Sequence, residues 1–180
     1  KLKMNNGIAA ISGPGAVGLT LASELEALGF SPRFIGRRGP CAAFTTIKRS
    51  DGQVTRYSWP KPSPDDLASA EIAFVAVKAF DLALALTSLV SHLEKNAGVI
   101  PVANGATEDI VRKVQKNAPD WRFRLGFCTF GVTVLAPNAL ALRSREGGVH
   151  FGALDPEEAK TKVEAALMAT PFFVWHKHAV

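Results

Sequence analysis

The sequence predicts an α/β fold of the doubly wound type, with a mainly parallel sheet and added antiparallel strands near the C-terminus. Between residues 8 and 118, short apolar runs alternate with stretches whose apolar residues recur at helical spacing. This alternation is typical of a parallel sheet with helices on both faces. From residue 123 the chain becomes a succession of β-rich runs, which we expect to pair antiparallel and to extend that sheet or form its edge.

The elements up to residue 66 each carry a local signal. IAAIS at 8–12 has the composition of a buried strand. The apolar spacing over 16–28 predicts a helix that ends at Gly29. RFIG at 33–36 is a second strand, TTIKRSDGQVTRYSW at 45–59 alternates around Asp51-Gly52 as a β-hairpin does, and KPSPDD at 61–66 is a polar connector.

The later elements follow the same rules. We expect strands at 71–77, 98–102 and 172–175, a helix at 80–93, and antiparallel strands within FRLGFCTFGVTVL, NALALRS and GVHFGAL. A helix at 107–117 has Glu108 and Asp109 in its first turn, where negative charge suits the helix dipole. A last helix at 155–168 is predicted from Asp155 as its N-cap and Pro156 at its first position.

Composition excludes several classes of protein. The chain has 180 residues, of which 47% are hydrophobic and 21% charged, as in an ordinary globular domain. No apolar run reaches the roughly 18 residues of a membrane span, and the interrupted N-terminal run is too short for a signal peptide. We therefore expect a cytoplasmic protein with no membrane partner.

The charge and the cysteine content of the chain limit the kinds of ligand that it is expected to bind. The net charge of +5 is spread over scattered basic residues, which favours a small anionic ligand over nucleic acid. Cys41 and Cys128 are too few for a disulfide framework or a zinc site. His176 and His178 at i, i+2 have no evident third ligand, so we interpret them as a frayed chain end and expect no metal.

The segment GPGAVG at 13–18 has the spacing G-x-G-x-x-G, between an apolar strand and a helix. Gly13 allows a sharp turn, Gly15 allows close approach to a pyrophosphate, and Gly18 allows close helix–strand packing. The pattern predicts a Rossmann-type dinucleotide site that includes the intervening Pro14, Ala16 and Val17. The alternative is a tight strand–helix turn without a ligand.

Residues after the second strand favour NADP over NAD. An NAD site usually has an acidic residue there, whereas this chain has Arg37 and Arg38 and no acid until Asp51. A guanidinium group pairs well with a 2′-phosphate. The alternative is two solvated surface arginines.

Lys78 follows the strand at 71–77, and Asn104 follows the strand at 98–102. The carboxyl ends of strands are where doubly wound sheets bind ligands, so both are candidates for contact with the cofactor or the substrate. The alternative is that both are solvated caps.

Taken together, GPGAVG, FIGRR, AVKAFD and PVANGATED resemble the ketopantoate reductase family, and the resemblance covers roughly residues 8 to 175. It implies reduction of the small 2-oxo acid 2-dehydropantoate to pantoate with NADPH, in pantothenate biosynthesis. It also implies that Gly13, Gly15 and Gly18 bind the pyrophosphate and Arg37 the 2′-phosphate. Lys78 would lie against the cofactor, and Asn104 near the nicotinamide and the substrate.

The sequence departs from the family in two places. Ala103 stands where the family usually has glutamine. The family also has a second, helical domain that carries the catalytic lysine, and this chain ends about where that domain should begin. We therefore expect residues 1–7 to be a disordered or tag-like N-terminus, 8–175 the dinucleotide-binding domain, and 176–180 the start of a linker to a domain absent from this chain.

The catalytic lysine is accordingly expected outside this chain, and Lys177, three residues from the end, is a poor substitute. Two other functions stay open. The chain could be a non-catalytic NADP-binding module, or part of a reductase of a different carbonyl substrate. A homodimer is also possible, since an exposed apolar patch where the second domain should dock would favour self-association.

Overall fold

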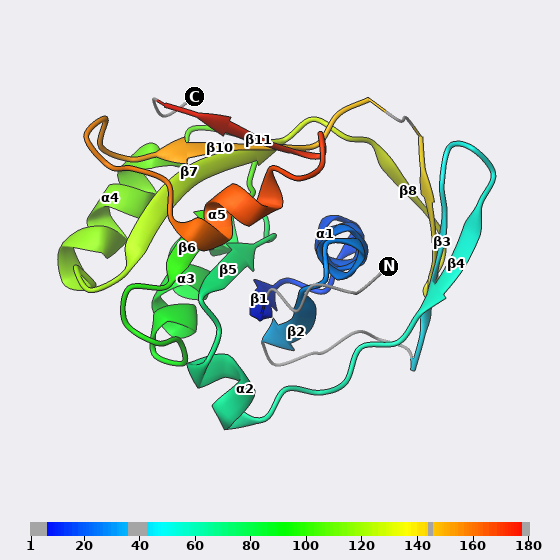
Figure 1. The fold of residues 1–180 in the computed structure, drawn as a ribbon, viewed down its shortest axis with the longest axis horizontal. Helices are drawn as coiled ribbons and strands as arrows, with labels where there is room; N and C mark the ends of the chain where they lie inside the picture. Colours follow the sequence, from blue (N-terminus) through cyan, green and yellow to red (C-terminus); the bar gives the residue numbers. More distant parts are fainter. Residues whose placement is uncertain (1–6, 36–42, 144–145, 178–180) are drawn as a thin grey trace.

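The computed structural model describes residues 7–35, 43–143 and 146–177. Its strands form two sheets, of order β11-β10-β7-β6-β5-β1-β2 and β4-β3-β9-β8 (Figure 1). The strands are β1 Ile8–Ser12, β2 Ser31–Ile35, β3 Thr45–Lys48, β4 Val54–Tyr57, β5 Ile72–Val75, β6 Gly98–Pro101, β7 Arg122–Cys128, β8 Val132–Ala136, β9 Ala139–Leu142, β10 Val149–Ala153 and β11 Phe173–His176. The helices are α1 Ala16–Ala27, α2 Pro64–Ala68, the short 3₁₀ helix η1 Ala79–Asp81, α3 Leu82–Val90, α4 Glu108–Asn117 and α5 Lys162–Leu167.

The larger sheet confirms the predicted fold class. β2, β1, β5, β6 and β7 run parallel to one another in this order. β10 then pairs antiparallel with β7, and β11 runs parallel to β10. The C-terminal strands thus extend a parallel sheet in the opposite direction, as expected for the region after residue 123.

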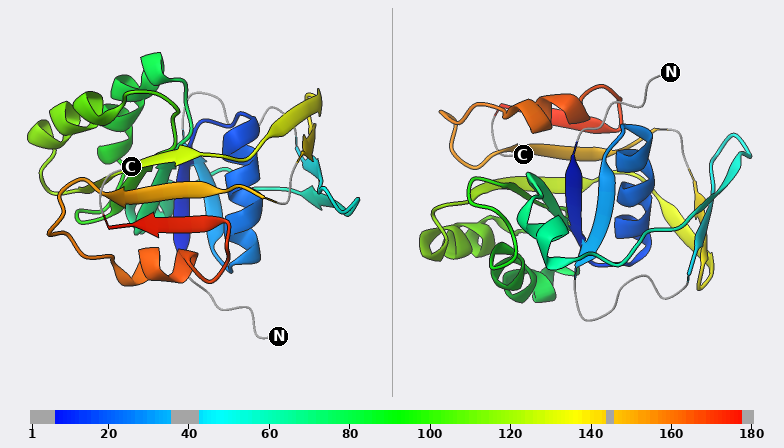
Figure 2. Two further views of the ribbon diagram at one scale, coloured as in Figure 1. Left: turned by 90° about the horizontal axis from the view of Figure 1, so that it is seen from above. Right: turned by 60° about the horizontal axis from the view of Figure 1, so that its bottom comes forward.

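Helices cover both faces of this sheet (Figures 1 and 2). Successive side chains of a strand point to opposite faces. In β1, Ala9 and Ile11 pack in the core that contains Leu21 and Leu25 of α1, whereas Ala10 packs in the core under α3 and α4. Because both faces are covered, the strands need continuous apolar runs, which is the pattern that the sequence shows.

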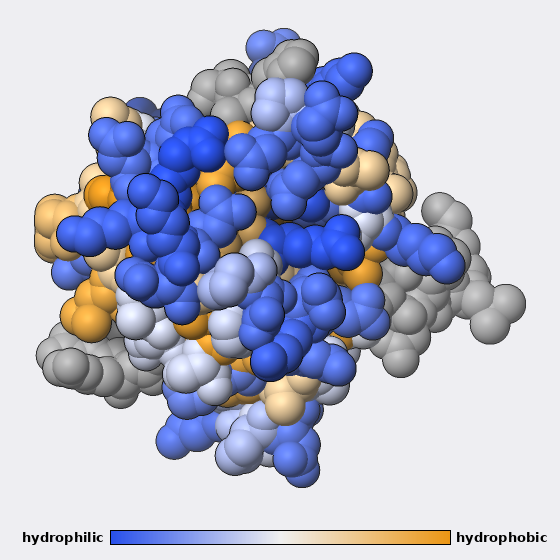
Figure 3. Space-filling model, turned by 90° about the vertical axis from the view of Figure 1, so that its left-hand side faces the viewer, coloured by the Kyte–Doolittle hydropathy of each residue, from blue (hydrophilic) through white to orange (hydrophobic). Residues whose placement is uncertain are grey.

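The face of the molecule on the α4 side is polar. In α4, Val111 and Val114 are buried, while charged side chains occupy much of the rest of the helix. The described atoms visible from this side are mostly hydrophilic, with small separate hydrophobic areas (Figure 3). No helix within the described ranges is long and apolar enough to cross a membrane.

The second sheet corrects the expected pairing of the late strands. The predicted hairpin at 45–59 is confirmed, since β3 and β4 pair antiparallel. However, β9 pairs with β3 and β8 with β9, so the chain leaves the larger sheet after β7 and returns to it at β10. The physical reason is burial, because Ile47 and Leu140 are almost fully enclosed in the core that also contains the apolar face of α1.

Two capping boxes alter the predicted helices. The last helix begins at Lys162 rather than Asp155, because Thr161 is its N-cap: the Thr161 hydroxyl accepts from the Glu164 amide, and the Thr161 amide donates to the Glu164 carboxylate. Ser63 and Asp66 form the same motif. The predicted connector at 61–66 therefore contains the start of α2.

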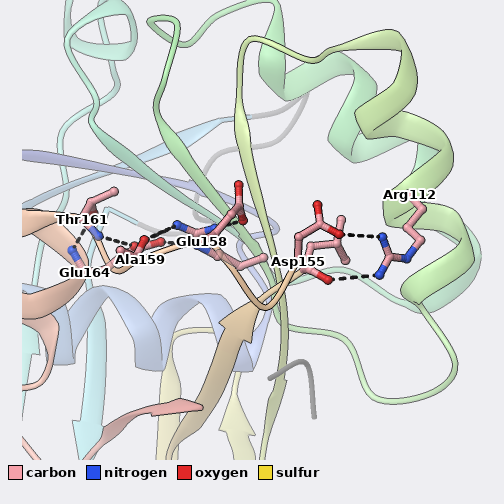
Figure 4. Close-up of polar contacts among 8 residues, drawn as sticks. Arg112, Asp155, Glu158, Ala159, Thr161 and Glu164 are labelled. Carbon is pink, nitrogen blue, oxygen red and sulfur yellow. Dashed lines mark hydrogen bonds and ion pairs between the residues drawn. The ribbon is translucent and has the colours of Figure 1, made fainter. Parts of the chain in front are cut away.

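The segment between β10 and α5 is held by arginines from two elements (Figure 4). Arg112 of α4 forms ion pairs with Asp155 and Glu108 and donates to the Leu154 carbonyl oxygen. Arg124 of β7 is fully buried and contacts Glu158, Glu164 and the Ala159 carbonyl oxygen. Asp155 is therefore an ion-pair partner here and not a helix cap.

Candidate functional site

The glycine loop joins β1 to α1, and two of its glycines are required by the protein itself. Gly13 has φ +100°, and a Cβ atom there would lie 2.4 Å from the Ala76 carbonyl oxygen. A Cβ atom on Gly18 would lie 1.9 Å from the Gly13 carbonyl oxygen. Both positions exclude a side chain, so these glycines make the tight turn and the close helix–strand packing possible.

Gly15 is different, because no atom of the described residues requires it to be glycine. Its φ of −78° is open to any residue. Apart from its two chain neighbours, no described residue has a heavy atom within 4 Å of the position where its Cβ would be. Gly15 is exposed at the mouth of the loop. The packing of the described residues does not explain why this position is glycine. A glycine here would allow a ligand to approach the backbone closely.

The N-terminus of α1 faces the same open space. Gly15 is the N-cap and provides no side-chain hydrogen bond, and the first turn contains no acidic residue. The first amide groups of a helix have no partner within the helix and carry partial positive charge. Together with the bare Gly15 backbone, they offer the donors and the partial charge that suit an anion such as a pyrophosphate.

A cleft of about 510 Å³, here called the Gly15 cleft, lies at the carboxyl ends of β5, β6 and β7, next to this loop. It brings together three segments that sequence reasoning selected separately: the glycine loop, Lys78 and Asn104. The lining residues are Gly15, Ala16, Val17, Ala76, Val77, Lys78, Ala79, Asp81, Val102, Ala103, Asn104 and Cys128. Gly13 and Gly18 shape the loop behind it, and Pro14 lies between Gly13 and Gly15.

Lys78 and Asn104 differ in how firmly they are held. Lys78 is exposed and forms no ion pair with a described residue, so its ammonium group is available to the cleft. Asn104 is also exposed, but its Oδ1 accepts a hydrogen bond from the Cys128 amide at 3.4 Å. This contact leaves the Asn104 Nδ2 group free to donate to a ligand.

Cys128 also lines the cleft, and the sequence analysis did not select it as a site residue. Cys128 is the last residue of β7, and β7 runs parallel to β6. The carboxyl ends of parallel strands meet at one edge of a sheet, so the position of Cys128 at a strand end could have indicated that it lies near Asn104. Burial raises the pKa of the Cys128 thiol above its ordinary value. The thiol is therefore neutral at pH 7 and acts as part of an apolar wall.

Arg37 and Arg38 lie outside the described residues. β2 ends at Ile35, which pairs with Ser12, the residue before Gly13. The predicted contact of these arginines with a 2′-phosphate thus stays a prediction.

Lys177 and His176 lie away from the Gly15 cleft. His176 pairs with Gly152, and Gly152 with Leu125, whereas Cys128 pairs with Val149 at the other end of β10. Lys177 is therefore displaced by about 13 Å along the strand direction from the level of Cys128, and it lines a different hollow with Lys160 and Trp175. This position does not suit a catalytic role at Asn104.

His176 hydrogen-bonds to His150, at 2.9 Å between Nε2 and Nδ1. His178, which the sequence analysis considered together with His176 as a possible metal ligand, lies outside the described residues. Within the described ranges, no group of three or more His, Cys, Asp or Glu side chains could hold a metal ion.

Comparisons with solved structures place the fold. A 2-dehydropantoate 2-reductase from Geobacter metallireducens GS-15 is 17% identical, with a TM-score of 0.73 over 94% of this chain and 58% of that one. A 2-dehydropantoate 2-reductase from Porphyromonas gingivalis W83 is 16% identical, with a TM-score of 0.73 over 95% of this chain and 64% of that one. A D-mandelate dehydrogenase, solved with NADH and anilino(oxo)acetate, is 20% identical, with a TM-score of 0.70 over 96% of this chain and 56% of that one.

At these identities the likeness shows the fold alone, and the chain spans less than two thirds of the length of these structures. No curated protein matches the sequence. Residues 9–156 match the family model of ketopantoate reductase PanE/ApbA. Since this match covers most of the sequence, the chain belongs to the ketopantoate reductase PanE/ApbA family.

Proposed function

We propose that this chain is the cofactor-binding domain of an NADPH-dependent oxidoreductase that reduces a 2-oxo acid. The observation that carries the proposal is the position of Gly15. It has open surroundings, it is the N-cap of α1 without a side-chain hydrogen bond, and it lines one cleft with Lys78 and Asn104. Membership of the ketopantoate reductase family supports the reaction class. The domain is proposed to cover residues 8–175, with residues 1–7 and 176–180 as its flanking segments, although β11 extends through His176.

The residues present fit a dinucleotide. The Gly15 backbone and the first amides of α1, including those of Ala16, Val17 and Gly18, would hold the pyrophosphate. Lys78 would add a positive charge beside it. Arg37, assisted by Arg38, would bind the 2′-phosphate, which is the reason to favour NADPH. The D-mandelate dehydrogenase neighbour contains NADH, so the fold alone does not decide between the two cofactors.

When bound, the reduced nicotinamide would supply a hydride for the keto carbon. In this chain, the Nδ2 group of Asn104 would donate a hydrogen bond to the substrate or to the cofactor, while the Cys128 amide fixes its orientation. The general acid that polarises the carbonyl and protonates the alkoxide is proposed to be a lysine outside this chain. Lys177 is not proposed for this role, because it lies away from the Gly15 cleft.

The favoured substrate is 2-dehydropantoate, which would place the protein in pantothenate biosynthesis. The names of several structural neighbours support it. A reductase of another carbonyl compound is the second candidate, because one structural neighbour is a D-mandelate dehydrogenase. A homodimer is supported by a Staphylococcus aureus neighbour described as a dimeric ketopantoate reductase.

Calorimetric titration of the chain with NADPH and with NADH tests this proposal. We expect both to bind and NADPH to bind more tightly. Equal affinities would contradict the assignment of NADPH, and binding of neither cofactor would contradict the dinucleotide site itself. If the chain binds NADPH but no longer form of the protein reduces a 2-oxo acid with it, a non-catalytic NADP-binding module would be favoured instead.

A further inference from the structure

Helix α3 presents apolar side chains to solvent as well as to the core. Leu82, Leu86 and Leu89 are buried on its inner face. On its outer face Leu84 is 69% exposed, and Phe80, in the short helix η1 directly before it, is 84% exposed. These two are the most exposed large hydrophobic side chains among the described residues. A helix that is apolar on all sides is ordinarily covered on all sides, so the outer face of α3 has the composition of a contact surface.

An apolar groove of about 370 Å³ lies between α3 and α4, which pack side by side (Figures 1 and 2). Ala83 and Thr87 line it from α3, and Ile110 lines it from α4. Because Ala83 and Thr87 are small, the groove stays open beside the projecting side chains. We call Phe80, Leu84 and this groove the α3 surface. It contains a projection and a hollow next to each other.

Two charges of opposite sign lie on the flanks of the α3 surface. Lys113 of α4 lines the groove. Asp81, the N-cap of α3, lies on the other flank, since it lines the Gly15 cleft and not the groove. Both side chains are exposed, and neither forms an ion pair with a described residue. The rim of the surface thus offers one negative and one positive charge to a partner.

These features complement one another, as a two-fold contact between identical chains requires. In such a contact a patch meets itself, so the same patch must supply both the projection and the hollow that receives it. Phe80 and Leu84 are the projection, and the groove is the hollow. A two-fold axis that passes between Asp81 and Lys113 would also bring Asp81 of one copy to Lys113 of the other, which favours the correct pairing.

We propose that the α3 surface is the interface of a homodimer, in which Phe80 and Leu84 of each copy pack against the groove of the other. Asp81 and Lys113 pair between the copies at the rim. The inference goes beyond the proposed function, in which a homodimer has no assigned surface, and it does not depend on cofactor binding. One helix face and one groove make a small contact, so we expect the dimer to dissociate on dilution.

Sedimentation equilibrium of the chain over a range of concentrations tests this interface. We expect a reversible equilibrium between monomer and dimer. Leu84→Glu places a charge in the apolar centre and should weaken the dimer about tenfold or more. Leu135→Glu is the matched control, because Leu135 is similarly exposed, at 60%, but lies on β8 in the second sheet. It should leave the dimer intact.

Two further measurements on Leu84→Glu separate this inference from other effects. Circular dichroism should show a folded protein, because the replaced side chain is exposed. NADPH should bind the variant as it binds the unmodified chain, since Leu84 does not line the Gly15 cleft. A failure of the dimer interface is therefore distinguishable from a failure of the cofactor site.

Exchange of the rim charges tests the pairing between copies. Asp81→Lys and Lys113→Asp should each weaken the dimer, because like charges then face each other across the contact. The double variant Asp81→Lys/Lys113→Asp should recover most of the lost affinity. Two independent local effects would instead add, so a double variant weaker than either single one would remove the pairing of Asp81 with Lys113.

The remaining outcomes decide on the surface itself. A chain that stays monomeric at every concentration would overturn the inference and leave the α3 surface to a different partner. A dimer that is lost in Leu135→Glu but retained in Leu84→Glu would place the interface on the second sheet. Assemblies that keep growing beyond two copies would contradict a two-fold contact, because such a contact closes on itself.

Discussion

Gly18 of α1 packs so closely on Gly13 that a Cβ atom at residue 18 would lie 1.9 Å from the carbonyl oxygen of residue 13. That oxygen is backbone and cannot move without disrupting the loop. We expect Gly18→Ala to lower the free energy of unfolding by an amount typical of overpacking, about 1–3 kcal/mol or more. Urea unfolding followed by circular dichroism measures this loss, and an unchanged midpoint would contradict the close packing.

The ion pair between Arg124 and Glu164 is the most deeply buried in the described chain, since neither side chain is exposed. Replacing Arg124 by Met would leave the Glu164 carboxylate without its partner in the core. Breaking such a pair typically costs about 3–5 kcal/mol, so we expect Arg124→Met to destabilise the protein by that order.

Arg112→Met is the matched control, because it removes the other arginine that holds the segment after β10, at a far more exposed position. Its loss should be much smaller. Equal losses in the free energy of unfolding for the two variants would show that the burial of Arg124 has no special weight.

Burial, and to a lesser extent the charge of the neighbouring His176, lowers the pKa of His150 below its ordinary value. The folded state then binds fewer protons than the unfolded state between that lowered pKa and the ordinary value of about 6.5. The contribution of His150 to stability is therefore complete above about pH 6.5 and is lost as the pH falls.

Urea midpoints at pH 7.5 and 5.5 test this dependence. The decrease toward acid pH should be smaller in His150→Gln than in the unmodified protein. His92→Gln, which changes a histidine on the surface after α3, should leave the decrease as it was. A decrease that is the same in all three proteins would rule out His150 as its source.

Arg37→Ala should weaken NADPH binding about tenfold or more and leave NADH nearly unchanged, because a hydrogen bond to a charged group contributes roughly 1.5–3 kcal/mol. Arg122→Ala is the control, since it removes an exposed arginine at the start of β7. Calorimetric titration that shows the same loss for both cofactors would argue against a 2′-phosphate contact.

The 180-residue chain should bind NADPH and yet fail to oxidise it at a useful rate with 2-dehydropantoate. General acid catalysis is typically worth about 10²–10⁴-fold, and Lys177 is displaced from the cleft that holds Asn104. NADPH absorbance with and without substrate measures this rate. Saturable oxidation that is lost in Lys177→Ala would overturn the assignment of the acid to a residue outside the chain.

Local patterns predicted most of the larger sheet. The runs that form β1, β5 and β6 are continuous and apolar because both of their faces are covered, and this pattern is readable without knowledge of the partners. The pairing of β3 with β9 was not predictable in this way. It joins segments far apart in the sequence, and it is decided by the burial of Ile47 and Leu140 beside α1.

In the candidate site, too, some features were predictable from local sequence patterns and others were not. Glycine spacing and strand ends led to Gly15, Lys78 and Asn104, and the structure brings these three into one cleft. The hydrogen bond from the Cys128 amide to Asn104 depends on how the ends of β6 and β7 meet. No short sequence pattern contains that arrangement.

The most direct test of a dinucleotide site is the affinity of Gly15→Val for NADPH, measured by calorimetry alongside circular dichroism. Among the described residues, no atom beyond the two chain neighbours lies within 4 Å of the Cβ position at Gly15, so the fold should persist, while the pyrophosphate would meet the valine. We predict loss of NADPH binding with an unchanged spectrum and unfolding midpoint. Retained affinity in a folded Gly15→Val protein would contradict the account and reduce the glycine loop to a structural turn.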